Sequence, residues 1–222
     1  MMSQIKRLLD IDDPNSLSAR LRRQRFKFFK SLIQTVPRPI KLLDVGGTQQ
    51  FWENMGFINE TDIRFTLLNV HLVEVKYPNF TSVIGDATDL GQYEDGEFDI
   101  VFSNSVIEHV GDFTNQKRMA QEIRRVGKRY FVQTPNFYFP IEPHFLFPGF
   151  QWLPVSVRIW LLAHFKLGWH PKVEDVIAAR EIVQSTRLLS KAEVIELFPD
   201  ADIYQERIWL LTKSFIAYKW GP

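Results

Sequence analysis

The sequence of 222 residues contains no cysteine, which excludes disulfide bonds, thiolate metal sites and a cysteine nucleophile. It also lacks an excess of charge of either sign. The formal net charge is +1, so the overall charge favours neither nucleic acid nor acidic partners. It has no uncharged apolar run of about 18 residues, and its N-terminal region lacks the apolar core of a signal peptide. We therefore expect a cytoplasmic protein that binds no nucleic acid.

The order of the expected secondary structure indicates an α/β domain. Apolar spacing predicts a helix over residues 16–35, which the prolines at 37 and 39 end. Strands and helices then alternate, a pattern that predicts a mostly parallel sheet with helices on both faces. The expected strands are residues 41–45, 64–70, 82–85, 98–103 and 129–134, and the expected helices are 50–57 and 113–126.

The C-terminal region predicts a helix followed by a hairpin. Ser190 and Glu193 have the spacing of a capping box, which opens a helix that stops at Pro199. Two strand-like runs follow, at residues 203–211 and 214–220, and only Thr212 and Lys213 separate them. So short a link requires an antiparallel hairpin.

Small and acidic residues follow three of the expected strands. Asp44 ends the first strand and precedes the Gly46-Gly47 turn, Asp86-Ala87 follows the third strand, and Ser103 ends the fourth. In open α/β sheets, ligands bind in the crevice at the carboxyl ends of the strands. These residues therefore indicate a ligand crevice at one edge of the sheet.

This order and spacing resemble the class I S-adenosylmethionine-dependent methyltransferases over residues 38–220. The resemblance implies one domain over residues 1–222 with a Rossmann-like, doubly wound sheet of seven strands that ends in an antiparallel hairpin. It also implies S-adenosyl-L-methionine as cofactor and methyl transfer to the oxygen or nitrogen of a small molecule. Within the domain we expect an N-terminal helical cap at residues 1–37 and an acceptor-binding insertion at residues 137–172.

The resemblance assigns roles to the residues of the crevice. The glycine loop would contact the methionine part of the cofactor, although Thr48 stands where the family usually has a further glycine. Asn69 occupies the position of an acidic residue that binds the ribose, and Asp86 matches the residue that binds the adenine amino group. An alternative for Asp86 is that it caps the following turn. The predicted cofactor-binding residues are Asp44, Gly46, Gly47, Asn69, Asp86, Ala87 and Ser103.

Two clusters with histidine follow the fourth and fifth strands, Glu108-His109 and Glu142-Pro143-His144. Because neighbouring strands bring their carboxyl ends together, these clusters are expected to converge near the cofactor's methyl group. Histidine titrates near neutrality, so His109 and His144 are the candidate catalytic residues that contact the acceptor. A packing or helix-starting role for His109 stays open.

Ubiquinone-pathway and small-RNA 2′-O-methyltransferases carry Glu-x-x-Glu-His at this point and bind a divalent cation there. This sequence has Ser105 in place of the first glutamate, and Glu142 or His144 would have to complete such a site. The alternative is that Glu108 pairs with a nearby arginine. No metal ligand is assigned, and metal dependence stays open.

Two segments bear on the acceptor. Residues 145–169 contain seven aromatic and two charged residues, which suits either core packing or a lid over an apolar or lipid-like acceptor. The first helix contains a basic run, interpreted as a solvated face, with attraction to an anionic membrane surface or a phosphate-bearing substrate as the alternative. This run comprises Arg20, Arg22, Arg23, Arg25, Lys27 and Lys30. Peripheral membrane contact is a further expectation.

Two other classes of protein share the opening strand, turn and helix. A nicotinamide-dependent oxidoreductase would need Gly-x-Gly-x-x-Gly, but the sequence has Gly46-Gly-Thr-Gln-Gln-Phe51, and no Tyr-x-x-x-Lys occurs. A non-catalytic binding or scaffold protein with the methyltransferase fold is the second alternative, which the altered glycine loop and Asn69 favour.

Overall fold

The computed structural model describes residues 16–221, so the first part of the predicted cap, residues 1–15, lies outside the described residues. A seven-stranded sheet with the order β3-β2-β1-β4-β5-β9-β8 forms the centre of the fold. Its first five strands are parallel, and β9 is antiparallel to both β5 and β8, so the predicted fold class is confirmed. The strands are β1 (Ile40–Val45), β2 (Ile63–Asn69), β3 (Phe80–Ile84), β4 (Ile100–Asn104), β5 (Tyr130–Pro135), β8 (Asp202–Ile208) and β9 (Leu211–Lys219).

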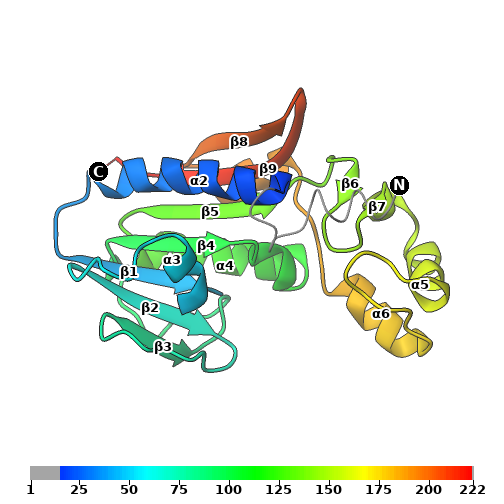
Figure 1. Ribbon diagram of the computed structural model, residues 1–222, viewed down its shortest axis with the longest axis horizontal. Helices are drawn as coiled ribbons and strands as arrows, with labels where there is room; N and C mark the ends of the chain where they lie inside the picture. The colour runs from blue at the N-terminus through cyan, green and yellow to red at the C-terminus, as the bar shows by residue number, and fades with distance from the viewer. Residues whose placement is uncertain (1–15, 222) are drawn as a thin grey trace.

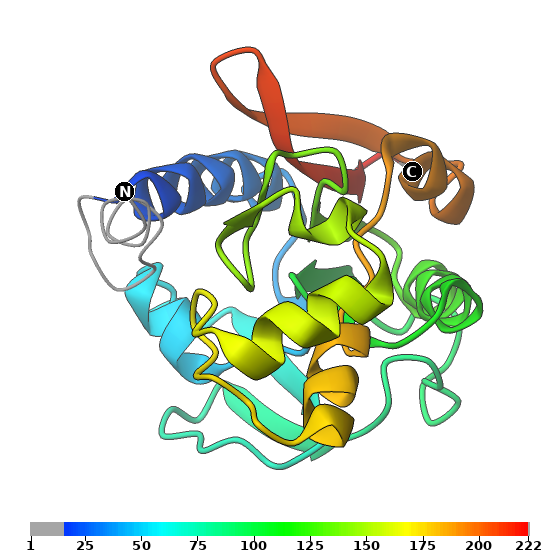
Figure 2. The same ribbon diagram turned by 90° about the vertical axis from the view of Figure 1, so that its right-hand side faces the viewer.

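Helices cover both faces of this sheet (Figures 1 and 2). On one face, α2 (Leu17–Ile33) and α3 (Gln49–Asn54) pack an aromatic core against β1, β4 and β5, with Phe29, Trp52 and Phe102 fully buried. On the other face, α4 (Phe113–Val126) and α7 (Lys191–Leu197) bury aliphatic side chains. None of the described helices has both the length and the apolar character needed to cross a membrane.

Capping side chains set where the helices begin. Ser16 caps α2, Thr48 caps α3 and Asp112 caps α4, each accepting a bond from a backbone N–H in the first turn. The predicted capping box at Ser190 and Glu193 is present at the start of α7. Thr48 is therefore a helix cap, which gives a local reason for threonine at this position.

Between β5 and α7, the chain forms a compact insertion beyond the carboxyl ends of the parallel strands (Figures 1 and 2). It contains β6 (Ile141–Glu142), β7 (Phe147–Pro148), a 3₁₀ turn at Phe150–Trp152, α5 (Val155–His164) and α6 (Val176–Gln184). Its small core joins α5 and α6 through side chains that include Leu162 and Ala179. This core therefore extends past residue 172, where the sequence placed the end of the insertion.

The turn of the C-terminal hairpin differs from the sequence prediction. The strands pair from Ile208 with Leu211, so the turn is formed by Trp209 and Leu210, and Thr212 and Lys213 belong to β9. The prediction was wrong because the turn residues are apolar and continue the strand-like pattern. Their side chains are 94% and 93% exposed.

Most of the basic run on α2 is exposed, but the interpretation as a solvated face is wrong for Arg25. Its side chain is 11% exposed and pairs with Glu206 of β8, with 2.6 Å between Nη2 and Oε2. The helix therefore directs one cation of this run into the protein.

Candidate functional site

The loop after β1 is closely packed around its two glycines. Gly46 has a φ of +79°, and a Cβ there would lie 2.4 Å from Cγ2 of Val106. A Cβ on Gly47 would lie 1.6 Å from Oδ2 of Asp44, far inside van der Waals contact. Both positions therefore require glycine, the first for its conformation and both for space.

Asp44 lies behind this loop and not in the crevice. Its side chain is buried and accepts a hydrogen bond of 2.7 Å from Nε1 of Trp52 on α3. Burial raises the pKa of Asp44 to about 7, against the lowering effect of the bond from Trp52. Asp44 thus connects the end of β1 to α3, and its carboxyl group packs against the loop at Gly47.

A cavity of about 400 Å³ lies in front of the loop, at the carboxyl ends of β1, β2 and β3. Four predicted cofactor-binding residues line it: Gly46, Asn69, Asp86 and Ala87. Asp44, Gly47 and Ser103 are not among its lining residues; Ser103 is fully buried, and its hydroxyl donates to the Val45 carbonyl oxygen at 3.2 Å. Residues that the sequence analysis missed complete the wall, including Leu68, Val106, Val110 and Asn115.

Two polar side chains of this cavity are held in fixed orientations. Asn69 donates from Nδ2 to the Gly47 carbonyl oxygen at 2.8 Å, which leaves its amide oxygen as the acceptor. Asp86 accepts two bonds of 2.8 Å at Oδ1, from the backbone N–H and the hydroxyl of Thr88. Asp86 therefore caps the following turn, as the alternative held, and lines the cavity as well.

A second cavity, of about 290 Å³, lies at the ends of β4, β5 and β9 beneath the insertion. Apolar side chains from 139–169 form part of its wall, including Phe139, Ile141, Leu146 and Trp169. Its polar lining comprises Arg22, Arg25, Asn104, Ser105, Gln133, Asn136, His144, Lys213 and Ser214. A further cavity of about 440 Å³ is lined by residues 137–193 and by no residue of β1 to β5.

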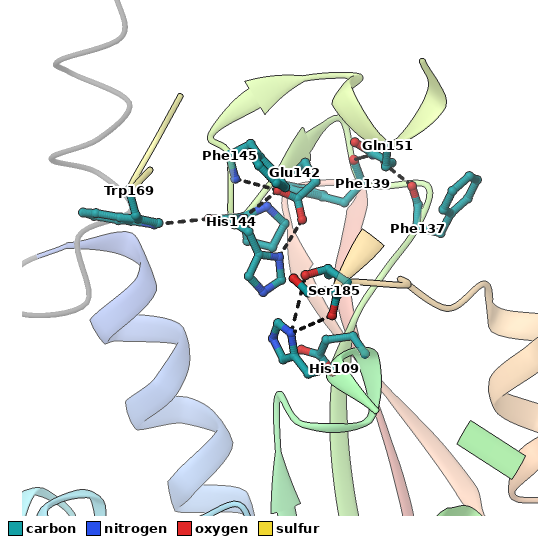
Figure 3. Close-up of polar contacts among 12 residues, drawn as sticks. His109, Phe137, Phe139, Glu142, His144, Phe145, Gln151, Trp169 and Ser185 are labelled. Atoms are coloured by element: carbon teal, nitrogen blue, oxygen red, sulfur yellow. Dashed lines mark hydrogen bonds and ion pairs between the residues drawn. The ribbon is translucent and has the colours of Figure 1, made fainter. Parts of the chain in front are cut away.

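The two candidate histidines lie close to each other, with His144 coming from the loop that Glu142 holds (Figure 3). His109 lines the first cavity, His144 lines the second, and their ring centroids lie 4.9 Å apart in an edge-to-face arrangement. His109 follows β4 in a 3₁₀ turn (Ile107–His109), and its Nδ1 lies 3.4 Å from the Ser185 carbonyl oxygen. The two clusters thus come together as predicted, and their place near the cofactor's methyl group stays a prediction.

Glu142 organises the loop that carries His144. Its Oε1 lies 2.6 Å from Nδ1 of His144, and its Oε2 accepts bonds of 2.7 Å from the backbone N–H groups of His144 and Phe145. Trp169 donates from Nε1 to the Pro143 carbonyl oxygen at 3.3 Å, a second contact that holds the same loop in place (Figure 3). Glu142 therefore orients the imidazole ring of His144.

The surroundings move the pKa values of the two histidines in opposite directions. Burial, together with the nearby His144, lowers the pKa of His109. Burial would also lower the pKa of His144, but the hydrogen bond and charge of Glu142 raise it above its ordinary value. The two rings therefore differ in their affinity for a proton.

Glu108 is the third side chain at this junction, and it is fully buried. Its Oε2 accepts a bond of 3.0 Å from the Thr134 hydroxyl, whereas no described residue bonds to Oε1. Burial raises its pKa to about 7. Glu108, His109 and His144 each place one donor atom within 4.8 Å of the others, so His144 completes this group while Glu142 supports it.

Comparison with known proteins places this chain among methyltransferases in fold. Residues 43–130 match the family described as a methyltransferase domain. Two uncharacterised Mycobacterium tuberculosis proteins, from strains CDC 1551 and H37Rv, are each 36% identical over 62 residues, which are 28% of this chain and 21% of theirs. The matched segment therefore covers only about a fifth of the length of these curated relatives.

Solved structures agree in architecture at low sequence identity. An Aquifex aeolicus S-adenosylmethionine-dependent methyltransferase is 16% identical, with a TM-score of 0.52 over 98% of this chain and 97% of its own. A Methanosarcina mazei protein of the same description is 12% identical, with a TM-score of 0.50 over 85% of this chain and 95% of its own. At these identities the likeness concerns the fold.

Proposed function

We propose that this chain is a methyltransferase that acts on a small molecule with S-adenosyl-L-methionine as cofactor, which the match of residues 43–130 to a methyltransferase domain supports. The cofactor would occupy the cavity lined by Gly46, Asn69 and Asp86. The acceptor would occupy the second cavity, beneath the insertion. The observation that carries this proposal is the contact between His109 and His144, where the two cavities meet.

Methyl transfer from a sulfonium is an in-line displacement, so the nucleophile must approach the methyl carbon to about 3–3.5 Å. His109 lines the first cavity and His144 the second, so each ligand would reach this pair from its own side, and transfer would require the two rings to move apart. The ring contact of 4.9 Å leaves no layer of other side chains between the two histidines. The wall between cofactor and acceptor is therefore thin at this point.

His109 and His144 are the residues that we assign to the acceptor. An imidazole at the junction can accept the proton that a hydroxyl or amine loses when it is methylated. Glu142 fixes the ring of His144 through the bond to Nδ1, so its Nε2 is the atom left for the acceptor. This assignment supports transfer to oxygen or nitrogen.

A divalent cation held by Glu108, His109 and His144 is a second role for the same side chains. The buried Oε1 of Glu108, which no described residue satisfies, favours it, as does the carboxylate behind His144. Titration of Mg²⁺, Mn²⁺ and Zn²⁺ into metal-free protein tests it, with His144→Gln as the variant. Binding that this substitution abolishes would support the cation site, and equal binding by both proteins would refute it.

The apolar part of the second cavity supports an acceptor with an apolar or lipid-like body. Phe139, Leu146 and Trp169 line it together with the polar residues at the strand ends. Peripheral membrane contact and a cytoplasmic location stay predictions. The membrane prediction is supported by Trp152 and Trp160 of the insertion, each 51% exposed.

Isothermal titration of S-adenosylhomocysteine into the purified protein tests the proposed function. We expect micromolar binding, weakened at least tenfold in Asp86→Ala. Asp89→Ala is the matched control, because Asp89 also caps a turn, through the Gly91 N–H, but does not line the cavity. Absence of binding by the folded wild-type protein would instead favour the alternative, a non-catalytic scaffold with the methyltransferase fold.

A further inference from the structure

We propose that the second cavity binds its acceptor through an oxyanion, a carboxylate or a phosphate, held by Lys213, Arg22 and Arg25. This inference rests on the proposed function, because it takes the second cavity as the acceptor site. It narrows the acceptor to an anion with an apolar body.

The charges that line the cavity are of one sign. Arg22 and Arg25 reach it from α2, Lys213 reaches it from β9, and the lining contains no aspartate or glutamate. The remaining polar side chains of the wall are neutral amides and hydroxyls, together with His144. A hollow with such a wall attracts an anion and repels a cation.

Glu206, an acidic side chain behind the wall, holds Arg25 in place. Glu206 is 4% exposed and holds the Arg25 guanidinium with two bonds, of 2.8 Å from Nε and 2.6 Å from Nη2. Arg25 also donates from Nη1 to Oε1 of Gln133, at 3.0 Å, and to Asn104. This network fixes the guanidinium at the ends of β4 and β5, and a bidentate pair of this kind is rigid.

Lys213 is the cation without a counter-charge of its own. No described residue accepts a hydrogen bond or forms an ion pair with its ammonium group, although the residue is half-buried. Burial lowers the pKa of Lys213 to about 8, and the charge of Arg25 acts in the same direction. Arg22 adds to this effect, and Glu206 opposes it. A bound oxyanion would supply the missing counter-charge.

The position of Lys213 in the sheet assigns this anion to the acceptor. Lys213 lies on β9, where its carbonyl oxygen accepts a bond of 2.9 Å from the Asn136 N–H. Two strands, β4 and β5, separate β9 from β1 and its glycine loop. With neighbouring strands about 4.8 Å apart, this separation is roughly 14 Å. The two cavities also share no lining residue, so the cations lie apart from the predicted cofactor site.

The test measures anion binding by protein saturated with S-adenosylhomocysteine, after the affinity for S-adenosylhomocysteine has itself been measured. Phenyl phosphate and phenylacetate are the two anionic probes, and neutral phenylacetamide is the uncharged match. Lys213→Met is the variant. Lys219→Met is its control, because Lys219 lies on the same strand and its ammonium is 3.4 Å from Asp200, away from the cavity.

We expect at least one anion to bind ten times more tightly than phenylacetamide. Lys213→Met should lower the affinity for that anion about tenfold and leave the affinity for phenylacetamide unchanged. Lys219→Met should leave the affinity for both unchanged. Whichever anion binds more tightly identifies the oxyanion as phosphate or carboxylate. The proposal would be overturned if phenylacetamide bound as tightly as the anions. It would also be overturned if Lys213→Met bound the anion as tightly as the wild-type protein.

Competition between the anion and S-adenosylhomocysteine would also overturn it, because the cations would then serve the cofactor's own carboxylate. Failure of the proposed function is seen separately, as absence of S-adenosylhomocysteine binding in the first titration. In that case the probes are titrated into the free protein. Anion binding that depends on Lys213 would then support the anion site without methyl transfer.

Discussion

Replacing Gly46 with alanine should disrupt the predicted cofactor site. The same change at Gly56 should lower the stability only through backbone strain. The two glycines have nearly the same conformation, with φ values of +79° and +77°. They differ in their surroundings: a Cβ on Gly46 would lie 2.4 Å from Cγ2 of Val106, and one on Gly56 would have no atom within 4 Å. The pair therefore separates the effect of the close contact from the effect of the dihedral angle.

The expected magnitudes follow from these two contributions. An alanine in the left-handed conformation costs about 1–2 kcal/mol relative to its preferred conformations. Forcing a methyl group into a packed site typically adds about 1–3 kcal/mol. We therefore expect the free energy of unfolding to fall by about 1–2 kcal/mol in Gly56→Ala and by about 2–5 kcal/mol in Gly46→Ala. Because Gly46 lines the cavity, its variant should also lose affinity for S-adenosylhomocysteine.

Urea denaturation and calorimetric titration of S-adenosylhomocysteine measure the two effects. Val106→Ala in the Gly46→Ala background should recover part of the lost stability, since it removes the methyl group that the new Cβ would meet. Equal losses of stability in Gly46→Ala and Gly56→Ala would refute this reasoning. Unchanged affinity in Gly46→Ala would show that the loop is not part of the cofactor site.

Three further outcomes are expected. Burial raises the pKa of Asp44 from 3.8 to about 7, so the folded state binds the extra proton and wild-type stability falls as pH rises between these values. Urea denaturation should show the stability of Asp44→Asn gaining about 2–3 kcal/mol relative to wild type between pH 5 and pH 8, because about two pH units separate pH 5 from the folded pKa, and a constant difference would contradict this. Arg25→Met should lower the free energy of unfolding by about 3–5 kcal/mol, because it leaves Glu206 buried without its partner. Adding Glu206→Gln should restore part of this stability, and urea denaturation of the double variant measures it. Trp209→Asn should keep or raise the melting temperature, because Trp209 is 94% exposed with a φ of 56° that asparagine tolerates better; a marked fall would show that the hairpin tip packs against the protein.

The sheet was predictable because its signals are local. Each parallel strand is an apolar run next to a turn, and the capping box at Ser190 marks a helix start within four residues. The hairpin turn was mispredicted because Trp209 and Leu210 are apolar at an exposed tip, so their residue types contradict their environment. Local patterns therefore fail where an exposed position carries a core-like residue.

The candidate site was predictable only in part, because its residues come together from distant segments. The sequence pointed to His109 and His144, since both follow strands that were expected to be neighbours. The proposed anion site gave no such signal. Arg25 and Glu206 are 181 positions apart, and Arg25 lies within a run of mostly exposed cations. Asp44 ends a strand as expected, yet its side chain turns behind the loop to Trp52. Spacing alone does not fix that orientation.

A crystal structure with S-adenosylhomocysteine bound tests most directly whether the two cavities are the halves of one active site. We predict that the ligand fills the cavity lined by Gly46, Asn69 and Asp86, with its sulfur directed toward the junction of His109 and His144. A ligand bound elsewhere, or with its sulfur turned away from this junction, would contradict methyl transfer into the second cavity.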